Sequence, residues 1–191
     1  KRSASQGASR RFRELQKRLQ ELASFFLPAK FSNTGMYTRV ELDYARGYRL
    51  LAHAEIEAYL EDRATEIVTK AKKKWDMTDK PGNIVLSLVA FRELVKNRAF
   101  DDPVQQKISA SVKVDVELAS FVQDSVEAYR KYVSNNNGIR ERNIIALLVP
   151  IGFPKSEIDQ TWLSTIDSFG SARGDVAHKS VGAQKALNPK D

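Results

Sequence analysis

Histidine is the side chain best suited to proton transfer near neutral pH. This 191-residue chain has only two histidines. His178 follows Arg173 by five residues, with Asp175 between them. On a helix this spacing corresponds to a turn of about 140° and a rise of about 7.5 Å, so a long arginine still converges with the histidine on one anionic group. Asp175 would hold the imidazole in one tautomer or pair with a neighbouring cation instead. The alternative is a helix with a surface arginine and an ordinary histidine.

The second histidine, His53, lies in an apolar helical pattern, and Glu57 follows it by four residues. That spacing places both side chains on one helical face, where they can form an ion pair. We interpret His53 as a packed or paired histidine of the long helix, with a positioning role in a site as the alternative.

The sequence offers little other catalytic or cofactor-binding equipment. The absence of cysteine excludes a disulfide scaffold, a Cys-ligated zinc site and a thiol nucleophile. Two histidines argue against a multi-histidine metal centre, and there is no phosphate-binding loop, dinucleotide fingerprint or nucleophile elbow. We therefore expect no metal and no cofactor.

Two further features bear on location. The longest apolar run, Ile144–Ile151, is far shorter than the ~20 residues that span a bilayer. The sequence therefore predicts no membrane-spanning segment. The lack of cysteine fits a reducing compartment, and we expect a cytoplasmic protein.

The balance of charge is basic, because 31 lysines and arginines against 24 aspartates and glutamates give a net charge of +7. Such a balance favours polyanionic partners, nucleic acid first and an anionic membrane surface second. Candidate nucleic-acid-binding residues lie near the N-terminus, in a run of lysines and beside the histidine motif: Arg10, Arg11, Lys72, Lys73, Lys74 and Lys179. For each group, a solvated helix surface is the alternative.

The hydrophobic periodicity is helical almost throughout and predicts an all-α fold of about six or seven helices. Helices are predicted over residues 10–26, 37–75, 83–98, 103–133 and 140–148, followed by two more in the C-terminal part. Residues 1–30 are expected to form a basic N-terminal amphipathic helix and residues 31–182 the main helical domain. Residues 183–191 are expected to form a frayed C-terminal tail.

Local signals refine this outline. Ser156 and Asp159 have the spacing of a capping box and predict the start of a helix. Gly170 is predicted to interrupt that helix and to let the next one lie close to another backbone. Gly47 inside the long helix predicts a bend or a close helix contact. Both tryptophans, at positions 75 and 162, stand on apolar patterns and are assigned to the core.

Several strings in this sequence resemble one known family. Asn136–Ile144, Leu147–Gly152 and Asp167–His178 resemble the RiboL-PSP type of HEPN domain through to its Arg-x4-His signature. Tyr48–Leu60 is similar to the first core helix of that family. The resemblance covers roughly residues 37–180.

The resemblance implies an up-down helical bundle that often forms homodimers with two Arg-x4–6-His motifs face to face. Many such domains are metal-independent ribonucleases of toxin–antitoxin and antiphage systems. Carried over by position, the catalytic residues are Arg173 and His178, with Gly174 and Asp175 as supporting residues. Gly174 stands where many of these ribonucleases have a polar residue, and the acidic residue follows at Asp175.

The function expected from this resemblance is cleavage of RNA by its own 2′-hydroxyl at a site shared by two protomers. RNA, a second copy of the chain, and an antitoxin or defence-system protein are the expected partners. The alternative is a non-catalytic HEPN module that binds RNA or a partner protein as an adaptor or regulatory subunit. A purely structural helical scaffold is the third interpretation.

Overall fold

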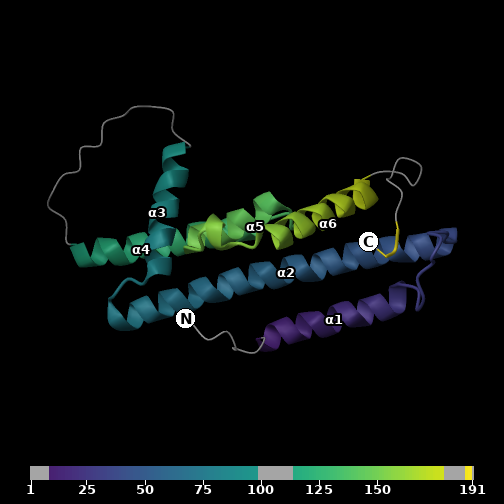
Figure 1. Ribbon diagram of the computed structural model, residues 1–191. Coiled ribbons are helices and arrows are strands. Elements are labelled where there is room, and N and C mark those ends of the chain that lie inside the picture. The colour runs from purple at the N-terminus through teal and green to yellow at the C-terminus, as the bar shows by residue number, and fades with distance from the viewer. Residues whose placement is uncertain (1–8, 99–113, 179–187, 191) are drawn as a thin grey trace. The chain divides into compact units, whose positions relative to one another are not determined.

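The computed structural model describes residues 9–98, 114–178 and 188–190 of the chain. Within these ranges it contains six α-helices, two short 3₁₀-helices and no β-strand (Figure 1). The predicted all-α fold is confirmed. The elements are α1 (Arg10–Phe26), α2 (Arg39–Thr78), α3 (Asn83–Arg98), α4 (Val114–Ser134), α5 (Glu141–Leu148), η1 (Val149–Ile151), η2 (Lys155–Glu157) and α6 (Gln160–His178).

The predicted helix boundaries agree closely with these elements in the first half of the chain. The helices predicted over 10–26 and 83–98 coincide with α1 and α3. The helix predicted over 37–75 corresponds to α2, which ends three residues later at Thr78. The predicted start of the fourth helix at 103 lies outside the described residues, and α4 is described from Val114.

Local hydrogen bonds set the starts of the first two helices. Ser9 caps α1, because its hydroxyl accepts a hydrogen bond from the Phe12 backbone N–H at 3.2 Å. At the start of α2, the Glu41 carboxylate accepts from the Thr38 N–H at 2.7 Å, and the Thr38 hydroxyl accepts from the Glu41 N–H at 3.2 Å. The Thr38 hydroxyl also donates to the Glu41 carboxylate at 2.8 Å, and the two bonds that this carboxylate accepts from Thr38 lower the pKa of Glu41 below its ordinary value.

The chain divides into two compact units, and the first half of α2 belongs to one unit and its second half to the other. Unit 1 consists of residues 1–60, 138–141 and 160–191, and it contains α1, the first half of α2 and α6. Unit 2 consists of residues 61–137 and 142–159, and it contains the second half of α2, α3, α4 and most of α5. The boundaries expected at residues 30 and 182 stay predictions.

In unit 1, α1 packs antiparallel on the first half of α2 (Figure 1). Phe12 lies against Tyr59 with ring centroids 6.1 Å apart, and Phe26 lies against Tyr44 at 6.3 Å. The start of α1 thus lies against the middle of α2, and the end of α1 lies near the start of α2. A Cβ at Gly47 would lie 3.0 Å from the Phe26 ring, and α2 continues through this position. The predicted close helix contact at Gly47 is therefore confirmed, without a break in the helix.

The other tight approach in unit 1 is made by α6. A Cβ at Gly170 would lie 3.3 Å from the Arg140 backbone nitrogen and 3.4 Å from the Ile139 carbonyl carbon. The predicted interruption at Gly170 is wrong, since α6 runs unbroken over Gln160–His178. The glycine keeps its helical conformation, and its missing Cβ lets α6 lie directly against the backbone of residues 139–140.

Two further predictions for the C-terminal part are wrong. The capping box predicted to open a helix at Ser156 is wrong, because Ser156 lies in η2 and α6 begins only at Gln160, directly after Asp159. Trp162 is 40% exposed and therefore not a core residue, whereas the assignment of Trp75 to the core is confirmed by its 6% exposure. The helical pattern around Trp162 is real, but the side chain borders a groove described below.

The core of unit 2 forms where three helices meet. Trp75 from α2, Val85 from α3 and Val122 from α4 form a buried cluster, with Ala71 and Val89 packed against it. Each side chain removed from water contributes in proportion to its apolar area, about 25 cal/mol per Å². This cluster therefore joins the second half of α2 to α3 and α4.

A buried hydrogen bond joins α4 to the end of α5. Tyr129 is fully buried, and its hydroxyl donates to the Leu147 carbonyl at 2.7 Å. Burial raises the pKa of Tyr129, so the hydroxyl stays protonated and remains a donor. Pro150, which has no backbone N–H, follows in η1 as α5 ends. The tyrosine thus supplies a donor to a carbonyl in the last turn of α5.

We expect Tyr129→Phe to lower the free energy of unfolding by about 1–3 kcal/mol, since it removes the donor and leaves a buried carbonyl behind. Thermal denaturation followed by circular dichroism measures this as a fall of several degrees in Tm. The matched control is Tyr132→Phe, because Tyr132 is 41% exposed on the same helix. Equal melting temperatures for the two variants would contradict a stabilising role for the buried hydroxyl.

Candidate functional site

The C-terminal helix α6 carries the Arg-x4-His motif predicted from the sequence. Arg173 is partly buried within this helix, and His178 is its last residue. The side chains of Asp175 and His178 lie outside the described part of the structure, as does the environment of Gly174. Their roles stay predictions, and the described site is the surrounding of Arg173.

His53 of α2 lies beneath this helix. The His53 side chain is only 2% exposed, and its ring stacks on Phe169 with centroids 6.4 Å apart and an interplanar angle of 22°. Phe169 precedes Arg173 by four residues, so the two share one face of α6. Nδ1 of His53 lies 3.5 Å from Oε2 of Glu57. The predicted packed, paired histidine is confirmed.

Burial favours the neutral imidazole of His53. Burial lowers the pKa of His53 below its ordinary value, the Glu57 carboxylate partly opposes this, and the positive charge of Arg173 lowers it further. The unfolded chain therefore binds a proton at His53 more readily than the folded chain does. This contribution to stability is fully present above pH ~6.5 and is lost as the pH falls towards the lower folded-state pKa.

Glu57 also binds the segment that precedes α5. The backbone N–H of Gly138 donates a hydrogen bond to Oε1 of Glu57. Gly138 is buried and has a φ of 123°, a conformation that L side chains rarely adopt. One carboxylate thus binds the 138–141 segment and lies beside the imidazole of His53, which ties this segment to α2.

The same segment is joined to α6 by a forked ion pair. Nε of Arg140 lies 3.2 Å from Oδ1 of Asp167, and Nη2 lies 3.3 Å from Oδ2. The Glu141 backbone N–H donates to Oδ1 of Asp167 at 2.9 Å. The hydrogen bond and charge of Asp167 raise the pKa of Arg140. These contacts hold α6 in a defined position two turns before Arg173.

Sequence reasoning missed the roles of Asp167, Arg140 and Gly138. Asp167 and Arg140 are 27 residues apart, so helical periodicity cannot connect them. The available signal was their presence in the strings that resemble one family, together with their opposite charges. The Asn-Gly step at residues 137–138 was a turn signal, but its partner Glu57 could not be inferred from spacing.

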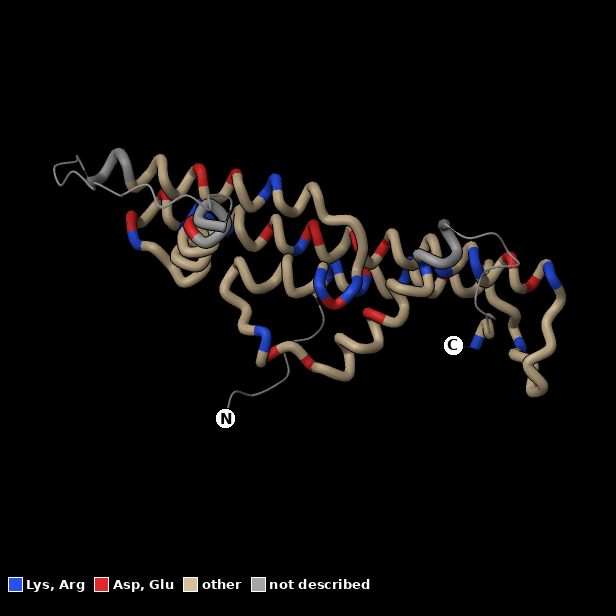
Figure 2. Tube along the Cα trace, turned by 90° about the horizontal axis from the view of Figure 1, so that it is seen from above, with Lys and Arg blue, Asp and Glu red and all other residues tan. Residues whose placement is uncertain are grey.

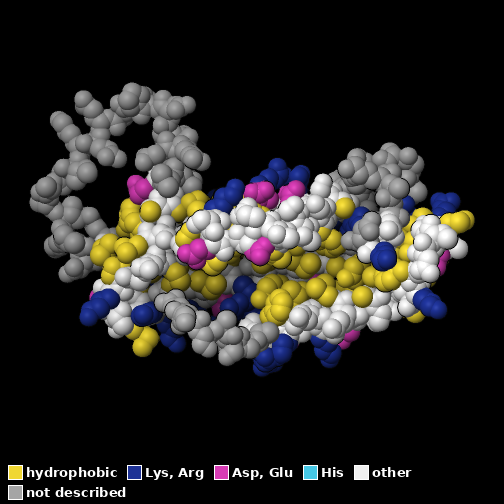
Figure 3. All heavy atoms as spheres, viewed as in Figure 1, with side chains coloured by type: hydrophobic (Ala, Val, Ile, Leu, Met, Phe, Trp, Pro, Cys, Tyr) yellow, Lys and Arg dark blue, Asp and Glu magenta, His cyan; other side chains and the backbone are white. Residues whose placement is uncertain are grey.

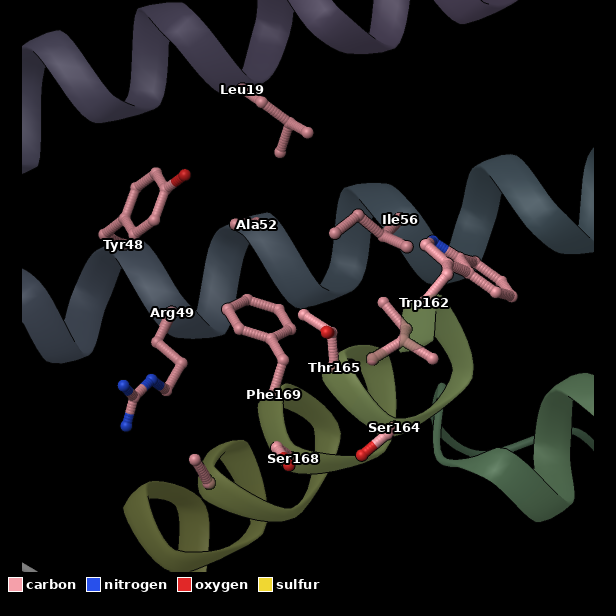
Figure 4. Close-up of a pocket in the computed structure, with 12 residues that line it drawn as sticks. Leu19, Tyr48, Arg49, Ala52, Ile56, Trp162, Ser164, Thr165, Ser168 and Phe169 are labelled. Carbon is pink, nitrogen blue, oxygen red and sulfur yellow. The ribbon is translucent and has the colours of Figure 1, made fainter. Parts of the chain in front are cut away.

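A groove opens beside this junction, within unit 1 (Figure 4). Its cavity has a volume of about 540 Å³ and is lined by residues of α1, α2 and α6. Tyr48 and Arg49 of α2 stand at one end, Trp162 of α6 stands at the other, and Phe169 lies between them. Phe169 therefore contacts His53 and also borders the groove.

The predicted nucleic-acid-binding residues belong to different units. Arg10 and Arg11 are exposed on α1 in unit 1, where Nε of Arg10 donates to Glu14 at 2.8 Å. The lysines at 72–74 belong to α2 in unit 2, and Lys179 lies outside the described residues. Basic and acidic positions are interspersed along the helices (Figure 2). The RNA-contacting roles of these residues stay predictions.

The lysine run of α2 contains one paired and two exposed side chains. Nζ of Lys72 lies 2.5 Å from Oδ1 of Asp76, and the Lys72 side chain is largely buried. Lys73 and Lys74 are exposed. Of the three, Lys73 and Lys74 are therefore the better placed to meet a phosphate.

Neither a metal centre nor a membrane-spanning helix is found among the described residues. Over the described ranges, no group of three or more His, Asp or Glu side chains is arranged to hold a metal ion. None of the helices in that part of the chain combines the length and apolar character needed to cross a bilayer.

Comparison with known proteins identifies one family. The sequence profile of RiboL-PSP-HEPN matches residues 13–191, which is most of the chain. No curated protein and no solved structure shows a significant match.

We expect the environment of His53 to be visible by NMR, since His178→Ala leaves it as the chain's single histidine. In this variant the His53 imidazole should titrate below pH ~6.5. Adding Arg173→Gln should raise the His53 pKa, because a neighbouring positive charge is lost, and adding Glu57→Gln should lower it. A pKa that both substitutions leave unchanged would contradict the contact of His53 with α6.

Proposed function

The chain belongs to the RiboL-PSP-HEPN family, and from this premise we propose that it is a metal-independent endoribonuclease. HEPN domains generally act as ribonucleases or RNA-binding modules and commonly dimerise. In this proposal Arg173 and His178 of two protomers form one composite site. The protein acts as a toxin or antiphage effector in the cytoplasm, and an antitoxin or defence-system protein is its regulatory partner.

The observation that carries the proposal is the continuity of α6. Because the helix is unbroken from Gln160 to His178, Arg173 and His178 are about 7.5 Å apart along its axis. The contacts of Phe169 with His53 and of Asp167 with Arg140 fix this helix before the motif begins. A charged group on a fixed helix needs little reorganisation to meet a phosphate.

The chemistry follows from the nature of RNA. Its 2′-hydroxyl is the nucleophile, so the protein supplies no serine or cysteine. One His178 removes the 2′-hydroxyl proton, and the His178 of the second protomer protonates the 5′-oxygen that leaves. The two Arg173 side chains stabilise the charge that develops on the phosphorane. The products are a 2′,3′-cyclic phosphate and a 5′-hydroxyl, and DNA is not cut.

One feature favours a second function, that of a non-catalytic HEPN module. Gly174 follows Arg173 directly and offers no polar side chain to orient the motif. A module of this kind binds RNA or a partner protein through the same helix without cleaving. The two functions are distinguished by one product, because only the ribonuclease leaves a 2′,3′-cyclic phosphate at the end of a cleaved RNA.

We expect the wild-type dimer to cleave total RNA and tRNA in EDTA, and His178→Ala to reduce the rate at least a hundredfold, because proton transfer is lost. Arg173→Ala should reduce both RNA affinity and turnover. Cleavage is followed on gels and by mapping of the end groups, at equal dimer content for every variant.

The matched control is Arg39→Ala, which removes an exposed arginine at the start of α2 and should leave cleavage unchanged. Full activity in His178→Ala, or a strict requirement for added metal, would refute the proposed mechanism. Binding without cleavage by a confirmed wild-type dimer would favour the non-catalytic module.

A further inference from the structure

The groove of unit 1 has a lining suited to an aromatic, anionic ligand. Three aromatic side chains border it, Tyr48, Trp162 and Phe169, together with Arg49. No carboxylate is among its lining residues. Hydrophobic side chains gather along the strip between α1 and α6 on the face shown in Figure 3.

The floor and the rim of the groove differ in polarity. Ala52 and Ile56 of α2 form an apolar floor, and the exposed hydroxyl side chains of Ser164, Thr165 and Ser168 lie along α6 (Figure 4). Burial raises the pKa of Tyr48, so its hydroxyl stays protonated and can donate a hydrogen bond. Flat apolar surfaces with a few polar groups at the edge suit a nucleobase, whose faces stack and whose edge hydrogen-bonds.

The groove and the Arg-x4-His motif lie along the same helix, α6. Phe169 and Trp162 precede Arg173 on α6 by four and eleven residues, which is about 6 Å and about 16 Å along the helix axis. Ala172, the immediate neighbour of Arg173, also lines the groove. A strand whose phosphate lies at Arg173 therefore has its neighbouring bases over the aromatic side chains.

We propose that this groove binds an unpaired nucleobase of single-stranded RNA, stacked on Trp162 and Phe169, next to the phosphate held by Arg173. The inference rests on the proposed RNA function and names its substrate class. A base in a duplex is already stacked on its neighbours, so its face is closed to the groove. The protein thus selects single-stranded RNA or loops over duplex RNA.

Charge favours RNA over a second copy of this chain as the occupant. Arg49 lines the groove and Arg173 lies beyond its end, so a polyanion in the groove comes close to two positive charges. A second copy carries the same net charge of +7 and would meet the Arg49 end of the groove with like charge, whereas the two Arg173 side chains of the proposed composite site meet across the phosphate of the RNA. Self-association through the groove is the alternative, and the experiment below is designed to detect it.

The chain contains an optical probe for this site. It has two tryptophans, and Trp75→Phe leaves Trp162, beside the groove, as the single tryptophan, which can be excited selectively over the tyrosines. In a His178→Ala background, which keeps the RNA intact, titration with a short single-stranded oligonucleotide should quench Trp162 fluorescence. The same sequence in a duplex should not. If Trp75→Phe does not fold, the difference in quenching between His178→Ala with and without Trp162→Phe gives the same information.

Affinity supplies the second readout. In the His178→Ala background, Trp162→Ala should weaken binding of the single-stranded oligonucleotide roughly tenfold, the usual scale for one base–aromatic stack. The matched control is Phe25→Ala, because Phe25 is 75% exposed on α1 and does not line the groove. It should leave the affinity unchanged.

Each outcome decides the proposal. Absence of quenching together with an unchanged affinity in Trp162→Ala overturns it. A Trp162 signal that changes with protein concentration alone, together with dimerisation that Trp162→Ala abolishes, assigns the groove to a second copy and also overturns it. RNA cleavage by the wild type without quenching refutes the base site and keeps the nuclease. Quenching without cleavage keeps the base site and refutes the nuclease.

Discussion

The carboxylate of Glu57 is the group on which the candidate site depends. It accepts the backbone N–H of Gly138, and it lies 3.5 Å from Nδ1 of the buried His53. The Glu57 side chain is only 18% exposed, and a carboxylate in such a place is costly unless it is hydrogen-bonded, so the bond from Gly138 offsets part of that cost. His53 in turn stacks on Phe169 of α6. Glu57 therefore contacts the 138–141 segment directly and α6 through His53. Hydrogen bonds to a charged acceptor contribute about 1.5–3 kcal/mol each.

The opposite side of this junction depends on an absent side chain. A Cβ at Gly170 would press on the backbone of residues 139–140, so glycine is what allows the forked Arg140–Asp167 pair to close. The close approach and the ion pair therefore support one another. An exposed ion pair contributes little on its own, and its value here is the fixed position of α6 rather than a large gain in stability.

These contacts also explain which parts of the structure the sequence could predict. Amphipathic periodicity and caps are local, so α1 and α3 were predicted to the residue. Gly170 was predicted to break a helix because the local cost of glycine was visible and its tertiary contact was not. Trp162 was assigned to the core because an apolar position on a helix looks the same whether it faces a core or a groove. The pairing of Glu57 with Gly138 spans 81 residues, beyond the reach of any local pattern.

In the proposed mechanism α6 has two tasks, which are to border the groove that takes a base and to carry the charge of Arg173 that meets the phosphate. Phe169 takes part in both the packing of α6 and the groove, since its ring stacks on His53 and it also borders the groove. A base in the groove and the charge of Arg173 are thus held by the same rigid element, and neither needs a second protomer. Proton transfer by two histidines does need one, because each chain carries a single His178. In the proposed mechanism, recognition of single-stranded RNA is therefore a property of the protomer, whereas cleavage is a property of the dimer. Dissociation of the dimer would stop cleavage without abolishing RNA binding.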